Sequence, residues 1–319
     1  DFETMMQLTY LTFTAPRRDD DAFASYKNRS KAELQNMDLN PSSSFSDSIT
    51  STLYSKHPRT LRMKADMVDK MNYDKILSMY QDRFKDASDF TFILVGNVDV
   101  EAVKPLIESY LGSLPSINRK ETFKDNHIAM RKGICKNEFI RQQETPKVNN
   151  FICYSGTCKY NLRNEILMSM TDQLLNFIYT EKVREDEGGT YGVYPMGQLI
   201  KYPTEKAVLQ IFFNTAPDKQ EKLIKIIYDE AEAFAKNGPD EASLNKVKEY
   251  MLKKHSEDLK ENGYWLNSID EYLYTGIDPV KDYEQIINSI TPKDVQQFAN
   301  ELLKQKNQIT VSMISPEKK

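Results

Sequence analysis

The sequence predicts an α+β fold built from tandem domains, in which helices cover a largely antiparallel sheet. Three observations predict it. The two ends of the chain repeat one another, and the second half has strand-like and helix-like stretches in the order of an α+β domain. The 319 residues, 39% of them apolar, also suffice for two hydrophobic cores.

The repeat relates residues 16–54 to residues 238–274, and residues 71–96 to residues 290–315. The offset between aligned positions stays between 219 and 221. A constant offset, with helices in the same order before a final strand, indicates two copies of one unit of roughly 200 residues. The second copy is predicted to be complete, whereas the first lacks its front.

The elements of the second copy follow from local patterns. Four strand-like stretches surround one helix whose apolar residues recur every fourth position, starting with Leu162, Ile166 and Met170. Five helical stretches and a last strand follow. The predicted strands are 134–141, 147–154, 190–200, 207–215 and 308–314, and the predicted helices are 161–184, 218–236, 240–260, 264–274, 279–288 and 292–305.

The first copy is predicted to contain mostly helices and one strand, Phe90–Val95, which would lack partners and leave an exposed edge. The chain begins inside a helix at residues 1–15, the counterpart of 218–236, so we interpret the N-terminus as a cut. The aspartates at 19–21 precede the next helix as a cap, because negative charge there favours the helix dipole.

These elements predict three segments along the chain. Residues 1–115 form the rear portion of a first domain, residues 131–319 form a complete second domain, and residues 116–130 form a linker. The linker is polar, follows Pro115, and shows neither helical nor strand periodicity.

Charge and composition exclude several classes of partner. The formal net charge is −4 without a long basic block, which argues against nucleic acid and anionic membrane surfaces. No apolar run approaches the roughly 18 residues of a transmembrane helix. No signal peptide opens the chain, but this is uninformative in a chain that starts inside a helix. Peptide substrates or protein partners are compatible with the charge balance.

Three cysteines, Cys135, Cys153 and Cys158, are too few for a disulfide framework and lack the CxxC spacing of zinc ligands. We interpret them as thiols in or beside strands. A bridge between Cys153 and Cys158 would need a tight turn, which Gly156 permits, and the redox state stays open.

The segment LLNFIYTEKVREDEGGTYGVYP, residues 174–195, joins the end of a helix to a tyrosine-rich strand. Gly188 and Gly189 stop the helix, and Arg184 and Tyr191 stand seven residues apart across the corner. Both side chains are therefore predicted at the rim of a sheet, where binding groups usually lie.

This corner, with Thr190 after the two glycines, resembles the C-terminal half of the insulinase/pitrilysin family of zinc metallopeptidases, and the resemblance covers essentially the whole chain. It implies tandem domains like those of insulinase and the mitochondrial processing peptidase. It also implies that Arg184 and Tyr191 bind the substrate backbone, supported by the corner residues Gly188, Gly189 and Thr190. Members of the family have four such domains, paired as two halves that enclose a peptide chamber.

The resemblance also implies where the chemistry lies. Members bind zinc through an HxxEH motif in the N-terminal half, and neither HxxEH nor HExxH occurs in this sequence. Its histidines, His57, His127 and His255, are far apart in sequence, and we interpret each as solvated rather than as a metal ligand. We therefore expect no catalytic residue or zinc here, and a zinc-bearing N-terminal half or partner subunit elsewhere. By analogy with bacterial members, the cell envelope or periplasm is the expected location.

Other interpretations of the same residues stay open. Arg184 can pair with a nearby carboxylate, and Tyr191 can pack as an ordinary strand aromatic. A phosphate site at the glycines is disfavoured, because GGTYG is neither GxGxxG nor a P-loop and a strand follows it. The strand 207–215 is predicted to be core rather than a peptide groove. One helix face is also predicted to pack in the core, and it comprises Trp265, Ile269, Tyr272 and Leu273.

The sequence thus predicts the non-zinc half of a zinc metalloendopeptidase, inactive alone, which closes the substrate chamber and positions the peptide. The alternative is a non-catalytic scaffold or assembly subunit of the same fold, like the core subunits of respiratory complexes. Retention of both Arg184 and Tyr191 argues against that alternative. An HxxEH motif upstream or in a neighbouring gene would favour the peptidase.

Overall fold

The computed structural model describes residues 1–185, 190 and 192–316, without the side chains of residues 184 and 185. It divides the chain into two compact units. Unit one comprises residues 1–39 and 62–126, and unit two comprises residues 40–61 and 127–319. The units follow contacts in space whereas the predicted segments follow the repeat, so the predicted boundaries stay predictions.

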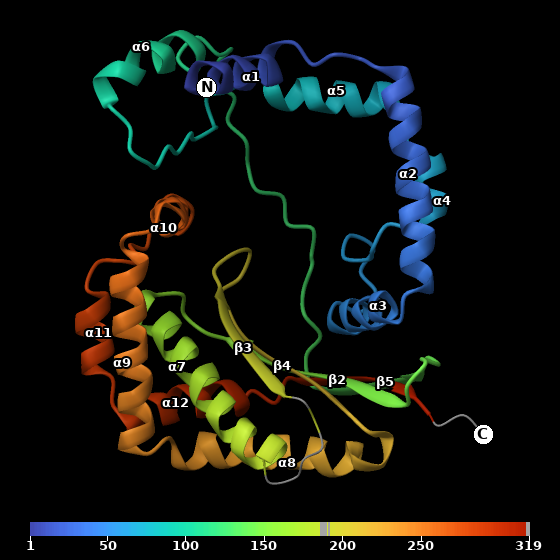
Figure 1. Ribbon diagram of the computed structural model, residues 1–319, viewed down its shortest axis with the longest axis vertical. Coiled ribbons are helices and arrows are strands. Elements are labelled where there is room, and N and C mark those ends of the chain that lie inside the picture. The colour runs from blue at the N-terminus through green and yellow to red at the C-terminus, as the bar shows by residue number, and fades with distance from the viewer. Residues whose placement is uncertain (186–189, 191, 317–319) are drawn as a thin grey trace. The chain divides into compact units, whose positions relative to one another are not determined.

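Unit one contains helices and no strand among its described residues (Figure 1). The predicted strand Phe90–Val95 is therefore wrong, because a strand needs a hydrogen-bonding neighbour and this unit offers none. Phe13 is buried in a small aromatic core, with ring centroids 4.9 Å from those of both Phe84 and Phe90. The helices are α1 (Phe2–Thr14), α2 (Asp20–Leu39), α4 (Ala65–Asp69), α5 (Tyr73–Phe84) and α6 (Val100–Tyr110).

The aspartate cap predicted before α2 is confirmed, since the Asp19 carboxylate accepts a hydrogen bond from the Ala22 N–H at 2.9 Å. Helix α6 was not predicted. Pro105 lies inside it and interrupts the pattern that a helix would show. Asp99 caps its first turn by accepting from the N–H groups of Glu101 and Ala102.

Unit two has the predicted order of elements, and most predicted boundaries agree within a few residues. Its strands are β1 (Ile134–Ile140), β2 (Lys147–Thr157), β3 (Val193–Ile200), β4 (Lys206–Thr215) and β5 (Gln308–Ser315). Its helices are α3 (Pro41–Leu53), α7 (Leu162–Tyr179), the π-helix η1 (Thr180–Glu185), the 3-10 turn η2 (Pro217–Lys219), α8 (Gln220–Asn237), α9 (Glu241–Asp258), α10 (Asn262–Thr275), α11 (Tyr283–Ser289) and α12 (Pro292–Leu303).

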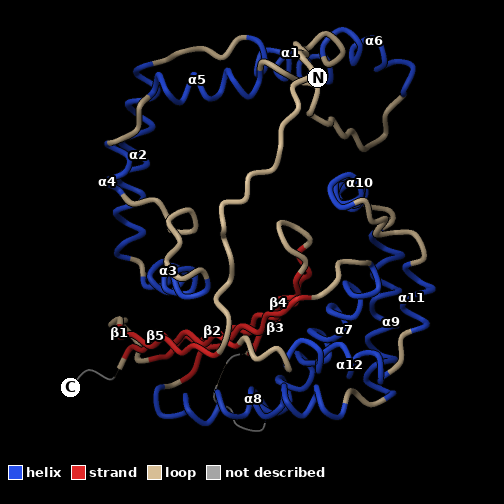
Figure 2. The backbone as a smooth tube through the Cα atoms, turned by 180° about the vertical axis from the view of Figure 1, so that it is seen from behind, coloured by secondary structure: helices blue, strands red, loops and turns tan. Residues whose placement is uncertain are grey.

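The five strands form one sheet in the order β1-β5-β2-β4-β3, seen as the central band of unit two in Figure 2. Among the described strands only the β1–β5 pair is parallel. The α+β class with a largely antiparallel sheet is thereby confirmed. β3 is an edge strand, and β4 pairs with β2 on one side and β3 on the other.

Both faces of this sheet are covered within unit two (Figures 1 and 2). On one face Ile152, Leu209 and Ile211 pack with the apolar sides of α7, α8, α9 and α12. On the other face α3 inserts Ile49 and Leu53 against Phe151 and its neighbours on β4 and β5. The second face explains why residues 40–61 join unit two, although they precede it in sequence by many residues.

The helix order agrees with the repeat, because α1 to α5 correspond in order to α8 to α12. α5 and α12 each have 12 residues and begin 219 residues apart (292 − 73). Their environments differ, however. Ile76 of α5 is 42% exposed, whereas its counterpart Val295 is fully buried in the core that α7, α8 and the sheet form in unit two. Unit one thus presents apolar positions that the second copy buries.

Two further expectations are settled by this unit. All three cysteines are free thiols, so the bridge between Cys153 and Cys158 is not formed, and burial raises the pKa of Cys153 to about 12. The core prediction for one face of α10 is wrong. Its side chains are exposed, because the described part of unit two places no element over them, and they are Trp265, Ile269, Tyr272 and Leu273.

We predict that Leu53→Ala lowers the free energy of unfolding of unit two by about 2–5 kcal/mol, because it opens a cavity between α3 and the sheet. Urea denaturation followed by circular dichroism measures the change. Ser46→Ala, at an exposed position of the same helix, is the matched control and should be neutral. Equal midpoints for both variants would contradict the packing of α3 on the sheet.

Candidate functional site

The helix that leads to Arg184 is firmly held. Asn161 caps α7 by accepting from the Asn164 N–H at 2.9 Å. At its other end Tyr179 is fully buried and donates its hydroxyl to the Ile227 carbonyl of α8 at 3.3 Å. α7 then widens into the π-helix η1, a conformation that occurs frequently at functional sites.

The strand that follows Tyr191 is also fixed at its start. Thr190 Oγ1 donates to the Gly192 carbonyl at 3.0 Å and accepts from the Gly192 N–H at 3.2 Å. Val193, the first residue of β3, is buried in the core. The described flanks of the corner thus carry a hydrogen bond from the end of α7 to α8 and a local pair of hydrogen bonds just before β3.

The structure does not test the predicted substrate-binding pair itself. The Arg184 side chain, Tyr191, Gly188 and Gly189 lie outside the described residues, and of the corner only Thr190 is described. The backbone of Arg184 belongs to η1. The roles of these residues stay predictions.

A groove of about 1160 Å³ runs along α7 in unit two, between β3 and the helices α9 and α10. One end is lined by Asn176, Phe177 and Tyr194, so the groove reaches the last turns of α7 and the start of β3. Arg184 follows Phe177 by seven residues and Tyr191 precedes Tyr194 by three. The position of the predicted pair relative to this end of the groove stays a prediction.

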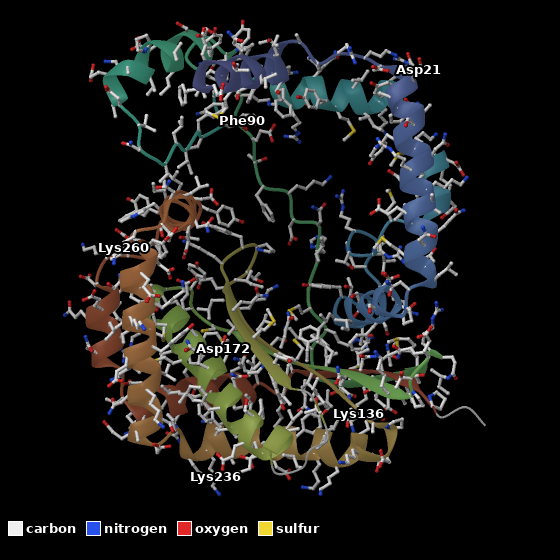
Figure 3. The ribbon with its side chains drawn as sticks, in the orientation of Figure 1. Asp21, Phe90, Lys136, Asp172, Lys236 and Lys260 are labelled. Atoms are coloured by element: carbon white, nitrogen blue, oxygen red, sulfur yellow. The ribbon has the colours of Figure 1, made fainter. Side chains whose placement is uncertain are left out.

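Asp172 lies in the floor of the groove, where α7 meets β3 (Figure 3). Its Oδ2 accepts a hydrogen bond from the Gly197 N–H at 3.0 Å. Gly197 leaves room for Met168 here, because a Cβ would lie 2.4 Å from the Met168 sulfur and that side chain would have to shift. Burial raises the pKa of Asp172 to about 6, although the Gly197 N–H opposes the shift.

This hydrogen bond occupies one N–H donor on the outer edge of β3, so that donor is not free to pair with another strand. In an antiparallel strand the N–H of every second residue points to the same side, so position 195 shares the outer side with Gly197. Pro195 has no N–H to donate there. β4 is paired on both sides and largely buried, which confirms the core interpretation of that strand.

A second group of acidic side chains lies at the other end of the groove. The Tyr160 hydroxyl donates to Glu271 Oε1 at 3.0 Å. Burial, reinforced by the neighbouring Glu271, raises the pKa of Glu165 to about 7. Sequence reasoning missed these residues, because Glu165 and Glu271 come from α7 and α10 and no local motif joins them.

His255 also faces the groove, and our interpretation of it as solvated is wrong. Its side chain is buried on α9, stacked on the Tyr283 ring at 4.4 Å, with Nδ1 3.2 Å from the Tyr264 hydroxyl. The helix looks charged in sequence because the neighbours of His255 face solvent. Two tyrosines bury it, Tyr264 on α10 and Tyr283 on α11, and the pattern of α9 alone does not show that these helices fold back over it.

The described residues contain no group of three or more His, Cys, Asp or Glu side chains arranged to hold a metal ion. In the same part of the chain, every helix is too short or too polar to span a lipid bilayer. The groove therefore offers carboxylates, hydroxyls and aromatic rings for binding, without a described set of metal ligands.

We predict that Asp172→Asn increases stability at neutral and alkaline pH. The folded-state pKa is raised from 3.8 to about 6, so ionisation of Asp172 opposes folding as the pH rises through this window. The variant keeps an acceptor for Gly197 and should gain about 1–2 kcal/mol at pH 8, but little at pH 4.

Urea titrations between pH 4 and pH 8 measure this difference. Asp270→Asn, an exposed carboxylate on α10 outside the groove, is the matched control and should show the same difference from wild type at every pH. A pH-independent effect of Asp172→Asn would contradict the buried, ionisable carboxyl.

The chain is similar in sequence to curated proteins. It is 24% identical over 294 residues to a zinc protease PQQL-like protein of Arabidopsis thaliana, covering 84% of this chain and 30% of that protein. It is 21% identical over 311 residues to the probable zinc protease PqqL of Escherichia coli, covering 94% of this chain and 32% of that protein. The chain thus spans about a third of the length of these relatives.

Solved structures show the same fold. The periplasmic protease PqqL of Escherichia coli superposes with a TM-score of 0.82 at 18% identity, over 99% of this chain and 35% of that chain. A mutant of the ferredoxin protease FusC, in complex with Arabidopsis ferredoxin, superposes with a TM-score of 0.80 at 15% identity. The match covers 99% of this chain and 34% of that chain. A chain of complex III2 from Candida albicans superposes with a TM-score of 0.64 at 11% identity. The match covers 91% of this chain and 70% of that chain.

A protein-family model identifies the family of this chain. The model described as "Peptidase M16 inactive domain" matches residues 70–251, which are 182 of the 319 residues and include α7, β3 and most of β1 to α9. The predicted resemblance to zinc metallopeptidases of this kind is confirmed, and the chain belongs to the peptidase M16 family.

Proposed function

We propose that this chain is part of the non-zinc half of an M16 zinc peptidase, where it closes the substrate chamber and positions the peptide. The observation that carries the proposal is the match of more than half of the chain to the inactive domain of this family. Two relatives that carry the name zinc protease support it, as does their length, about three times that of this chain.

Arg184 and Tyr191 are the proposed substrate-binding residues. A guanidinium presents a planar fork of N–H donors and a phenol presents one O–H, so the two can converge on one peptide carbonyl. Donors held in place before the reaction stabilise the charge that develops on that oxygen. The anchored flanks at Tyr179 and Thr190 support such pre-organisation.

The groove extends the proposed binding surface away from the corner. Its aromatic rings can cover apolar parts of a peptide, whereas its carboxylates and tyrosine hydroxyls can bind main-chain or side-chain donors. The outer edge of β3 accepts no simple strand addition at residues 195–197, because Pro195 lacks a donor and Asp172 occupies the Gly197 N–H. We therefore propose that the peptide is held mainly through side chains there.

The zinc chemistry is assigned to polypeptide outside this chain. The described residues provide no group of His, Cys, Asp or Glu side chains that fits zinc. A zinc-bearing N-terminal half or a partner subunit would supply it. A periplasmic location is part of the proposal, by analogy with the periplasmic protease PqqL of Escherichia coli.

A scaffold function is the second candidate. The complex III2 chain with this fold supports it, because the fold alone does not select proteolysis. The two functions differ at the corner. A peptidase needs the Arg184 and Tyr191 side chains for turnover, whereas a scaffold needs only the packing around them.

We predict that Arg184→Ala and Tyr191→Phe in the intact protein, with its zinc-bearing half, each lower kcat/KM for peptide cleavage by about 100-fold. Loss of one donor to a developing oxyanion has this magnitude. The unfolding midpoint should stay unchanged. Steady-state kinetics on a quenched fluorescent peptide, together with thermal melts, measure both quantities.

Two matched controls accompany these variants. Lys136→Ala removes an exposed cation on β1, and Tyr202→Phe removes an exposed phenol between β3 and β4. Both should retain wild-type kcat/KM. Unchanged cleavage in Arg184→Ala and Tyr191→Phe would reject the substrate-binding assignment and favour the scaffold.

A further inference from the structure

The groove along α7 carries more negative charge than its own lining neutralises. The described lining contains four carboxylates and one lysine, Lys254, which forms an ion pair with Asp258 at 2.5 Å. The other three carboxylates, Glu165, Asp172 and Glu271, have no ion-pair partner in the described part of the chain. Carboxylates that are partly removed from water without a cation are costly, so a bound cation would stabilise the groove.

Two of these carboxylates come together at the end of the groove that lies away from Phe177. The Tyr160 side chain is 8% exposed, and its hydroxyl donates to Glu271 Oε1 at 3.0 Å. Burial, together with the neighbouring Glu271, raises the pKa of Glu165 to about 7. Because two adjacent carboxylates repel one another, the pair favours either a shared proton or a cation between them.

The chain does not supply that cation from its described residues. Lys201, between β3 and β4, lies near this end, with Nζ 5.9 Å from the centre of the Tyr160 ring. Its ammonium group donates instead to the Thr275 carbonyl at the end of α10. The described carboxylates are also not arranged to hold a metal ion. The charge and the geometry therefore favour an organic cation as the occupant.

His255 gives an independent indication of a ligand in the same groove. Its side chain lines the groove and is only 6% exposed. Nδ1 lies 3.2 Å from the Tyr264 hydroxyl, whereas Nε2 has no hydrogen-bond partner among the described residues. Tyr264 and Glu271 stand two turns apart on α10, roughly 11 Å along its axis. A ligand at Glu271 that also reaches Nε2 must therefore be extended, as a peptide is.

We propose that this end of the groove binds a basic side chain of the peptide, with Glu165 and Glu271 holding its cationic group and His255 contacting the neighbouring main chain. The inference rests on the proposed function, because it names the class of peptide that the groove takes. It makes the two glutamates specificity-determining residues. A guanidinium can donate to both carboxylates at once, so arginine is expected to bind at least as tightly as lysine.

The length of α7 places the basic residue within the peptide. Glu165 and Phe177 are twelve residues apart on this helix, which is roughly 18 Å along its axis. An extended peptide covers this distance in about five residues. α7 continues from Phe177 toward Arg184, the proposed partner of the peptide next to the scissile bond. The basic residue is therefore expected at least about five residues from that bond.

Peptide binding to the natural-length protein, that is, the intact protein with its zinc-bearing half, tests the inference. Labelled peptides with otherwise neutral side chains carry one arginine at successive positions. Each is matched by a peptide with citrulline, which has the shape of arginine without its charge. Fluorescence anisotropy, with the zinc chelated to stop cleavage, measures the Kd of each peptide.

At one position, the arginine peptide should bind about 10-fold more tightly than its citrulline partner, as expected for hydrogen bonds to charged groups. Lysine and acetyl-lysine at that position form a second pair, which separates a guanidinium site from a site for either cation. Equal binding of arginine and citrulline at every position would overturn the inference.

Variants then assign the preference to the two glutamates. Glu165→Gln and Glu271→Gln should each weaken the preference for arginine, and the double variant should bind both peptides equally. Glu249→Gln, at an exposed position of α9 outside the groove, is the matched control and should keep the 10-fold preference. The measured quantity is a ratio within each variant, so a change in overall affinity does not affect it. An undiminished preference in the double variant would overturn the assignment.

The same peptides separate this inference from the proposed function. With zinc present, Arg184→Ala should slow cleavage of both peptides and keep the ratio of their Kd values. A normal effect of Arg184→Ala on cleavage, together with equal binding of the two peptides, would overturn only the basic-side-chain site. Unchanged cleavage in Arg184→Ala, together with tighter binding of the arginine peptide, would reject the role of the corner and support the site at Glu165 and Glu271.

Discussion

The structure of unit two depends on one constraint, which is that its sheet is apolar on both faces and needs helices on each. Residues such as Ile152 and Leu209 on one face and Phe151 and Val208 on the other leave no side that water can cover at low cost. The helices that follow the strands bury the first face. The second face is buried by α3, which comes from the earlier copy of the repeat. The two copies are therefore joined by packing as well as by sequence.

This constraint also positions the proposed site. α7 must lie flat against β3 for its apolar side to be buried, and Gly197 permits the close approach. This packing buries the Asp172 carboxylate between α7 and β3, and the burial raises its pKa and opposes its ionisation. The corner that carries Arg184 and Tyr191 then joins the end of α7 to the start of β3. Its flanks are fixed by Tyr179 and Thr190, even though the pair itself lies outside the described residues.

Much of the fold could be predicted because the relevant signals are local or repeated. Apolar residues at every fourth position define α7, and the offset near 220 predicts the order of five helices. The errors occur where burial depends on distant elements. Phe90–Val95 has strand-like residues but no neighbouring strand, and Trp265 has core spacing but an exposed ring, with Nε1 donating to the Leu259 carbonyl. His255 looked solvated because Tyr264 of α10 and Tyr283 of α11, which bury it, lie outside its own helix. For the same reason the pairing of Glu165 with Glu271 could not be found.

The central claim is that the Arg184–Tyr191 corner contacts the peptide substrate, and photocrosslinking measures this most directly. The natural-length protein would carry Tyr191→p-benzoylphenylalanine, with Lys136→p-benzoylphenylalanine on β1 as the control position. After irradiation with a labelled peptide substrate, the account predicts covalent label at position 191 and not at position 136. Label at neither position, or equally at both, would contradict it.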